Sequence, residues 1–290
     1  MSAAEVKLAS LARQPSGRVE RAFAALHASR SRALIAYLTA GDPSPDRTVG
    51  LVRALERGGV DILELGVPFS DPIADGPVIQ QASERALAAG TSVATVLALV
   101  RELRRESELP VIVFSYLNPI LRYGFERFAD DAADAGVDGV LLTDLTIEEA
   151  DDYVDAMRQR GLDCVFLVTQ TTPRERIAEI VKRSSGFVYL VSRAGVTGMS
   201  ASISGDAIPL LERTRERTDL PLALGFGLST REHMQEIAPY AEGAVVGSAF
   251  MRLVAEHGDD GGLEGKLEAL AGDFKQGLKL PENASGMAAV

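Results

Sequence analysis

The chain has 290 residues, of which 46% are hydrophobic, and this is enough for one large domain with a sizeable core. Its formal net charge of −11, with no basic stripe, argues against nucleic acid as a partner. No apolar run reaches the ~20 residues of a membrane span and no signal pattern opens the chain, so we expect a cytoplasmic protein without a membrane partner. One cysteine and three histidines, without a Cys/His cluster, argue against a disulfide and a metal site.

Short apolar runs alternate with amphipathic patterns along the chain. We expect strands at residues 33–38, 60–65, 110–114, 137–142, 163–168, 187–191, 221–224 and 243–246. We expect helices at residues 17–29, 44–57, 77–89, 92–106, 125–135, 147–160, 173–183, 208–217, 230–237, 250–257 and 263–278. The continuously apolar runs are typical of strands buried on both faces, as in parallel sheets.

Eight strand–helix units in about 250 residues predict an α/β fold of the (β/α)8 TIM barrel type, with an extra N-terminal helix. An open, doubly wound sheet is the alternative, and the even spacing of the units favours the barrel. We interpret residues 17–278 as a single barrel domain, residues 1–16 as a flexible N-terminal extension and residues 279–290 as a flexible tail.

Two acidic residues stand at the end of the second predicted strand, and in a barrel the chemistry sits at the C-terminal ends of the strands. Glu64 lies inside an apolar run, where a carboxylate is costly and its pKa should rise towards neutrality. Asp75 follows in the adjoining loop, which is rich in Pro and Gly. Together they suggest a proton-transfer site. The alternatives are a Glu that binds a backbone amide and an Asp that caps a turn.

Glycines follow the seventh and eighth predicted strands, at Gly225-Phe226-Gly227 and Gly247-Ser248. Glycines let backbone N–H groups approach a phosphate, and the helix N-terminus that follows favours negative charge. Barrels commonly bind phosphate at these two loops, although ordinary glycine turns are the alternative. Neither motif contains Lys or Arg, so such a cradle would consist mostly of backbone.

The segment after the sixth predicted strand, residues 193–205, is long, glycine-hinged and not periodic. Loops of this kind are either lids or solvated connections. Aromatic and aliphatic side chains at strand ends either enclose a flat aromatic ligand or belong to the core; they are Tyr37, Phe114, Tyr116, Leu141, Tyr189 and Phe226. We expect Cys164 to be a buried apolar filler and His233 to lie on the surface of a helix.

These residues make the chain resemble the tryptophan synthase alpha subunit family over residues 17–257. The most specific motif is LELGVPFSDP at residues 63–72, followed by ADGP at residues 74–77. It is supported by YLTAGDP at residues 37–43 and by YLVSRAGVTG at residues 189–198. The resemblance supports the barrel and implies an active site at its C-terminal face.

The resemblance implies retro-aldol cleavage of indole-3-glycerol phosphate to indole and glyceraldehyde 3-phosphate. Glu64 matches the acid–base that protonates indole C3 and accepts the proton of the glycerol hydroxyl next to the breaking bond. Asp75 matches the acid that binds the indole N–H and stabilises the positive indolenine. The other matched residues are Gly198, Gly227, Gly247 and Ser248 for phosphate; Tyr37, Phe114, Leu141, Tyr189 and Phe226 for the indole pocket; Arg193 and Thr197 for the lid; and Pro68, Phe69 and Asp71 for the partner loop.

The resemblance also implies a beta subunit as partner, in an alpha2-beta2 complex, with no cofactor in this chain and pyridoxal phosphate only in the beta subunit. The alternatives are a free-standing lyase of the same family and a catalytically weak alpha-like regulator of a beta subunit. The chain departs from the family pattern at Thr143, Thr146, Thr169, Gln170 and residues 199–204. These departures concern pocket polarity and lid closure more than the proton chemistry.

Overall fold

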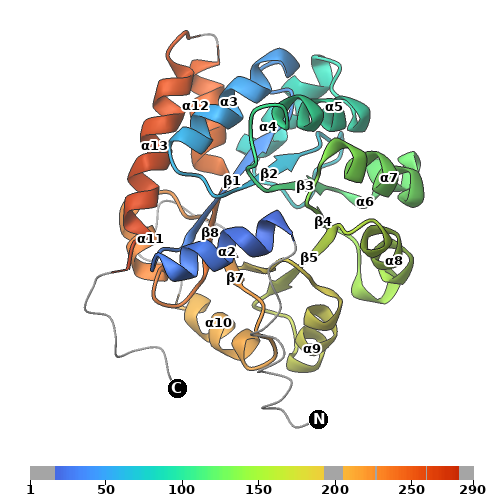
Figure 1. Cartoon of the computed structure of the whole chain (residues 1–290), viewed down its shortest axis with the longest axis vertical. Helices are drawn as coiled ribbons and strands as arrows, with labels where there is room; N and C mark the ends of the chain where they lie inside the picture. The colour runs from blue at the N-terminus through green and yellow to red at the C-terminus, as the bar shows by residue number, and fades with distance from the viewer. Residues whose placement is uncertain (1–16, 193–204, 226, 259, 281–290) are drawn as a thin grey trace.

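The computed structural model describes residues 17–192, 205–225, 227–258 and 260–280, and Figure 1 shows them as a ring of strands surrounded by helices. The strands are β1 (Ala33–Thr39), β2 (Ile62–Gly66), β3 (Val111–Ser115), β4 (Gly139–Leu142), β5 (Asp163–Thr169), β6 (Val188–Val191), β7 (Leu222–Gly225) and β8 (Gly243–Val246). Each strand pairs in parallel with the next, and β8 closes the barrel on β1. The prediction of a (β/α)8 barrel with an extra N-terminal helix is therefore confirmed.

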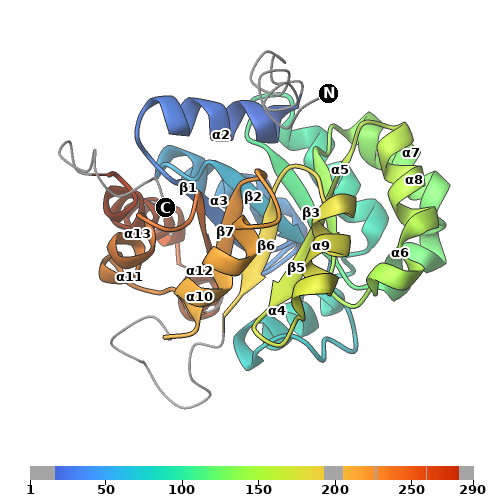
Figure 2. The same ribbon diagram turned by 90° about the horizontal axis from the view of Figure 1, so that it is seen from below.

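The helices surround this barrel, except for the first, which lies across one of its ends (Figure 1 and Figure 2). They are α2 (Arg18–Ala28), α3 (Pro45–Arg57), α4 (Pro77–Ala88), α5 (Val93–Leu103), α6 (Leu117–Tyr123), α7 (Phe125–Ala135), the 3-10 turn η1 (Ile147–Glu149), α8 (Asp151–Gln159), α9 (Arg174–Arg183), α10 (Ala207–Arg215), α11 (Arg231–Ile237), α12 (Ser248–His257) and α13 (Leu263–Gly277). Among the described residues, no single helix is long and apolar enough to cross a membrane. Only α4 and α5 taken together, with a 93° bend between them, meet that length and composition.

The helices differ most from the prediction at two places, after β3 and at the start of α8. The structure adds α6, whose Asn118-Pro119 pair resembles a turn signal in the sequence. Pro119 is compatible with a helix because it lies in the first turn, where a backbone N–H has no partner within the helix. The predicted helix at residues 147–160 begins instead with the tight turn η1, and the α-helix starts at Asp151.

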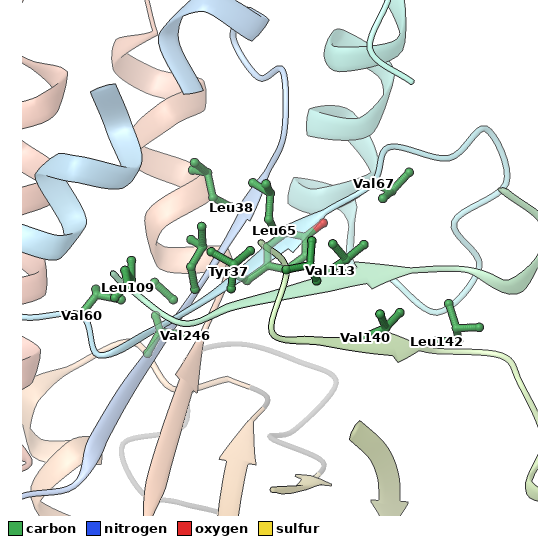
Figure 3. Packing of buried hydrophobic residues seen from close by; sticks show 14 of the residues in the cluster. Tyr37, Leu38, Val60, Leu65, Val67, Leu109, Val113, Val140, Leu142 and Val246 are labelled. Atoms are coloured by element: carbon green, nitrogen blue, oxygen red, sulfur yellow. The ribbon is translucent and has the colours of Figure 1, made fainter. Parts of the chain in front are cut away.

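Alternation along the strands separates two apolar layers. Ile35, Ile62 and Ile112 point into the barrel and form one buried cluster with their neighbours. Leu65 and Val113 belong to the larger cluster between the strands and the surrounding helices, part of which is shown in Figure 3. Both faces of every strand are therefore buried, which explains the continuously apolar runs.

Helix α2 lies across one end of the barrel (Figure 2). Its Val19 and Phe23 are buried, and the Phe23 ring lies 6.0 Å from the ring of Phe187, the residue before β6. Because Phe187 precedes its strand, α2 covers the N-terminal end of the barrel. The C-terminal ends of the strands and the loops that follow them lie at the opposite end, where barrel enzymes carry their chemistry.

The last turns of the described chain return to this N-terminal end. Lys279 forms an antiparallel bridge with Ser31, and the Leu280 N–H donates to the Arg30 carbonyl at 3.0 Å. The predicted tail at residues 279–290 therefore begins with two residues that pair with the barrel. The rest of that tail, from residue 281, and the predicted N-terminal extension lie outside the described residues.

Candidate active site

Glu64 points into the barrel from β2, beside Tyr37 of β1 and Ile112 of β3 in register. It is 1% exposed, and within the described residues neither carboxylate oxygen has a hydrogen-bond partner. Burial without compensation disfavours the charged form and raises the pKa of Glu64 to about 8. At neutral pH this side chain therefore carries a proton and can donate it.

Asp75 lies in the loop after β2 and is half-buried. The Tyr116 hydroxyl donates to its Oδ2 at 3.0 Å and accepts from the Ala74 N–H at 2.9 Å. Burial raises the pKa of Asp75, and the hydrogen bond from Tyr116 opposes that rise by favouring the carboxylate. Tyr116 thus connects the end of β3 to the acidic loop, a pairing that sequence spacing did not reveal.

Four predicted pocket residues, Tyr37, Phe114, Leu141 and Tyr189, lie on strands. The rings of Tyr37 and Phe114 meet edge to face, 5.2 Å apart, and Leu141 pairs with Phe114 in register. Tyr189 points inward from β6, on the far side of the barrel. These side chains and Glu64 line the same interior, as the alternation of the strands predicts.

Glycines on neighbouring strands make room for the two tyrosines. A Cβ atom at Gly66 would lie 2.3 Å from the Tyr37 hydroxyl, and one at Gly225 would lie 2.3 Å from the Tyr189 hydroxyl. No side chain fits at either distance. Burial raises the pKa of both hydroxyls, so each remains a neutral hydrogen-bond donor.

The predicted phosphate residues that the structure describes follow β7 and β8. Gly247 precedes α12 and Ser248 is its first residue. Gly227 follows β7 with φ +82°, a conformation that favours glycine. The first N–H groups of α12 have no partner within the helix, so this end of the barrel offers donors to an anion. The remaining predicted site residues, Arg193, Thr197, Gly198 and Phe226, lie outside the described residues.

The predicted partner loop lies against Tyr116. Pro68 is buried, the Phe69 ring lies 5.2 Å from the Tyr116 ring, and Asp71 is exposed. Ile73, two residues further, is 88% exposed. The loop therefore presents an apolar and an acidic side chain to the outside while its other side contacts the residue that binds Asp75.

Cysteine and histidine side chains lie away from this site. Cys164 is buried, as expected for a filler, and burial raises the pKa of its thiol to about 12. The prediction that His233 lies on the surface is wrong: the side chain is buried, and its Nδ1 accepts a hydrogen bond from the Ser229 N–H at 3.3 Å where α11 begins. Across the described ranges, no group of three or more His, Cys, Asp or Glu side chains is arranged to hold a metal ion.

Known proteins are similar to this chain in sequence and in architecture. Residues 23–279 match the family model for the tryptophan synthase alpha chain. The chain belongs to the tryptophan synthase alpha chain family. The alpha chain of Solibacter usitatus is 55% identical over 261 residues, which cover 90% of this chain and 98% of that protein. The alpha chain of Methanosarcina acetivorans is 46% identical over 262 residues, covering 90% of this chain and 94% of that protein.

Solved structures agree with the family assignment. A chain of Mycobacterium tuberculosis tryptophan synthase superposes with a TM-score of 0.84 at 38% identity, over 92% of this chain and 100% of that chain. The tryptophan synthase alpha subunit of Legionella pneumophila superposes with the same TM-score, 0.84, at 37% identity, covering 91% of this chain and 98% of that chain. Membership in this family gives the chain a lyase activity in tryptophan biosynthesis.

Proposed function

We propose that the chain cleaves indole-3-glycerol phosphate by a retro-aldol reaction into indole and glyceraldehyde 3-phosphate. The observation that carries this proposal is Glu64, a buried carboxyl group without a hydrogen-bond partner among the described residues and with a pKa of about 8. Such a group is protonated at neutral pH and becomes a base once it has given up its proton. The reaction needs both roles in turn.

The proton balance of the cleavage follows from these two roles. Glu64 donates its proton to indole C3, and the ring becomes a cationic indolenine. The bond from C3 to the glycerol carbon then breaks, its electrons return to the ring, and the hydroxyl proton on that carbon passes to Glu64. The carbon becomes the aldehyde of glyceraldehyde 3-phosphate. Asp75 accepts a hydrogen bond from the indole N–H and stabilises the positive charge of the indolenine.

The substrate would span the barrel mouth. The indole ring would lie between Tyr37, Phe114, Leu141 and Tyr189 in the barrel interior, and Phe226 is a further proposed pocket residue. Its phosphate would bind the backbone at Gly198, Gly227, Gly247 and Ser248, near the start of α12. Arg193 and Thr197 would belong to a lid over the bound substrate. No step in this scheme needs a cofactor in this chain.

A beta subunit that contains pyridoxal phosphate is the proposed partner, in an alpha2-beta2 complex. The loop with Pro68, Phe69 and Asp71 supports this, because Ile73 beside it is 88% exposed while Phe69 packs on Tyr116. A partner bound to this loop would therefore influence the position of Asp75 through Phe69 and Tyr116. Assembly with the beta subunit would in this way affect catalysis.

The test is release of indole from indole-3-glycerol phosphate by the purified chain, with and without a beta subunit. We expect a low rate alone and a large rise with the partner. Glu64→Gln should abolish indole release while the fold persists, because the glutamine side chain keeps the shape of glutamate but cannot donate the carboxyl proton. Glu84→Gln, an exposed change on α4, is the matched control and should behave as wild type.

The other outcomes separate the alternatives. Full activity without a partner supports a free-standing lyase. Absence of indole with the beta subunit present overturns the reaction and leaves a regulator of that subunit. Near-normal turnover by Glu64→Gln overturns the assignment of the acid–base.

A further inference from the structure

The loop that carries Asp75 has few internal restraints. Between β2 and α4, the Ile73 N–H donates to the Asp71 carbonyl at 2.9 Å and the Asp75 N–H donates to the Pro72 carbonyl at 3.1 Å. Neither bond ties the loop to a regular element. Backbone hydrogen bonds anchor the two ends of the segment, from the Val67 N–H to the Phe114 carbonyl of β3 and from the Gln80 N–H to the Gly76 carbonyl at the start of α4. Between these ends, side chains that reach the loop from outside also hold the position of Asp75 relative to Glu64.

Gln80, in the first turn of α4, is such a side chain. Its Nε2 donates to the Asp75 carbonyl at 2.9 Å and to the Pro72 carbonyl at 3.3 Å. Both partners are acceptors only, so the amide nitrogen, and not its oxygen, must face them. Two loop carbonyls on either side of the turn are thus held by one neutral group.

The helix that carries Gln80 is itself anchored on the barrel. Arg85, one turn further along α4, forms a two-pronged ion pair with Asp42, with Nε and Nη2 each 2.8 Å from a carboxylate oxygen. Asp42 is fully buried in the loop after β1, so removing Arg85 would leave a buried acidic side chain without its ion-pair partner. The pair fixes α4 relative to β1, the strand beside Glu64.

We propose that Gln80 is a positioning residue for Asp75, acting from a helix that the Asp42–Arg85 pair holds in place. This inference rests on the proposed retro-aldol function. Gln80 does not touch the substrate; it sets the distance between the carboxylate of Asp75 and the acid–base Glu64. Tyr116 holds the Asp75 side chain, and Gln80 holds the backbone on which that side chain stands.

Gln80→Glu tests the inference with almost no change of shape. The new carboxylate cannot donate and faces two carbonyl oxygens, so the loop should move away. We expect kcat for indole release to fall about 10²-fold, as small displacements of a catalytic group do, with KM little changed. Gln81→Glu makes the same chemical change on the next, exposed residue and should keep the wild-type kcat.

The decisive comparison is a double-mutant cycle with Asp75→Asn. If Gln80 acts through Asp75, Gln80→Glu should cost much less in the Asp75→Asn background than in wild type. Gln80→Leu, which removes the donor without adding charge, should lower kcat in the same way. It also serves as the test if Gln80→Glu does not fold.

Two results overturn the positioning role: wild-type kcat in Gln80→Leu and Gln80→Glu, or an equal loss in both backgrounds. An inactive wild-type chain, with the beta subunit present, overturns the proposed reaction instead. The two failures are therefore distinguishable.

Discussion

Glu64 is held where its charge cannot be solvated, and this has a cost for folding. Its pKa rises from 4.5 to about 8 on burial, so the folded state binds a proton that the unfolded state has lost between these pH values. The free energy of unfolding is therefore unaffected by Glu64 below pH 4.5. It falls as the pH rises from 4.5 to about 8, and Glu64 causes no further change above that. The group that we propose as the acid–base thus destabilises the folded state at neutral and alkaline pH.

Glu64→Gln should remove this dependence. From pH 4.5 to pH 8 we expect the wild-type free energy of unfolding to fall, relative to the variant, by on the order of 3–5 kcal/mol. Denaturant unfolding of both proteins across that range measures it, and the difference between the two curves cancels the other titrating groups. Parallel curves would contradict the burial of an uncompensated carboxyl group.

Tyr116 should control the ionisation of Asp75. In Tyr116→Phe the hydrogen bond to the carboxylate is lost, so the pKa of Asp75 rises further. The acidic limb of the indole-release rate should then move to higher pH, and kcat should fall about tenfold, because one hydrogen bond to a charged group is lost. The measurement is kcat against pH.

Tyr123→Phe is the matched control for this change. Its hydroxyl donates to Asp131, at 2.6 Å, on the α6–α7 side of the barrel and away from the site. That variant should keep the wild-type pH profile. An unshifted acidic limb in Tyr116→Phe would show that Asp75 ionises independently of Tyr116.

At the scale of the elements, three strands begin with the same arrangement. Asp61, Asp138 and Glu242 each precede an even-numbered strand. Their carboxylates accept hydrogen bonds from the N–H groups of Leu34, Val111 and Leu222, at the starts of β1, β3 and β7, at 2.7, 2.8 and 2.8 Å. Each acid also pairs with a basic side chain from a surrounding helix; these are Lys275, Arg104 and Arg215. The repeated device fixes strand starts to helices at the end of the barrel away from the site.

Asp138→Asn should therefore destabilise the barrel. The Asp138 side chain is 7% exposed and pairs with Arg104 at 2.7 Å and Arg18 at 3.2 Å. Removing its charge leaves the largely buried Arg104 with carbonyl acceptors but without its ion-pair partner, and the expected loss is about 3 kcal/mol. The denaturant midpoint at unchanged slope measures it, with the exposed Asp134→Asn as control. Equal midpoints for the two variants would contradict the role of the device.

At the scale of the molecule, barrel closure brings together residues that are far apart in the chain. Tyr37, Glu64, Phe114 and Tyr189 come from β1, β2, β3 and β6, and all point into one interior. Gly247 reaches the same end because β8 pairs with β1, and a Cβ atom there would lie 3.3 Å from the Tyr37 Cβ. The end of the barrel opposite α2 therefore gathers the acid, the aromatic wall and the N-terminus of α12 in one place.

The order of the strands, every helix except α6, the barrel, and the placement of Glu64 on β2 and of Asp75 in the loop that follows could be predicted from the sequence. Such features depend on local periodicity and on residue types that stand out against it: a Glu in an apolar strand, or glycines after a strand. The family motifs then assigned chemistry to these positions. Helix α6 was missed because an Asn-Pro pair signals a turn as readily as the first turn of a helix.

Only the tertiary structure decided which side chains meet. The bond from Tyr116 to Asp75, the clamp of Gln80 on the loop and the burial of His233 all depend on how separate elements pack. So does the need for glycine at 66 and 225, since a tyrosine from a neighbouring strand fills the space of the missing side chain. Sequence periodicity specifies the face on which a residue lies; register and packing between distant segments determine its contacts, and the pKa of Glu64 follows from those contacts.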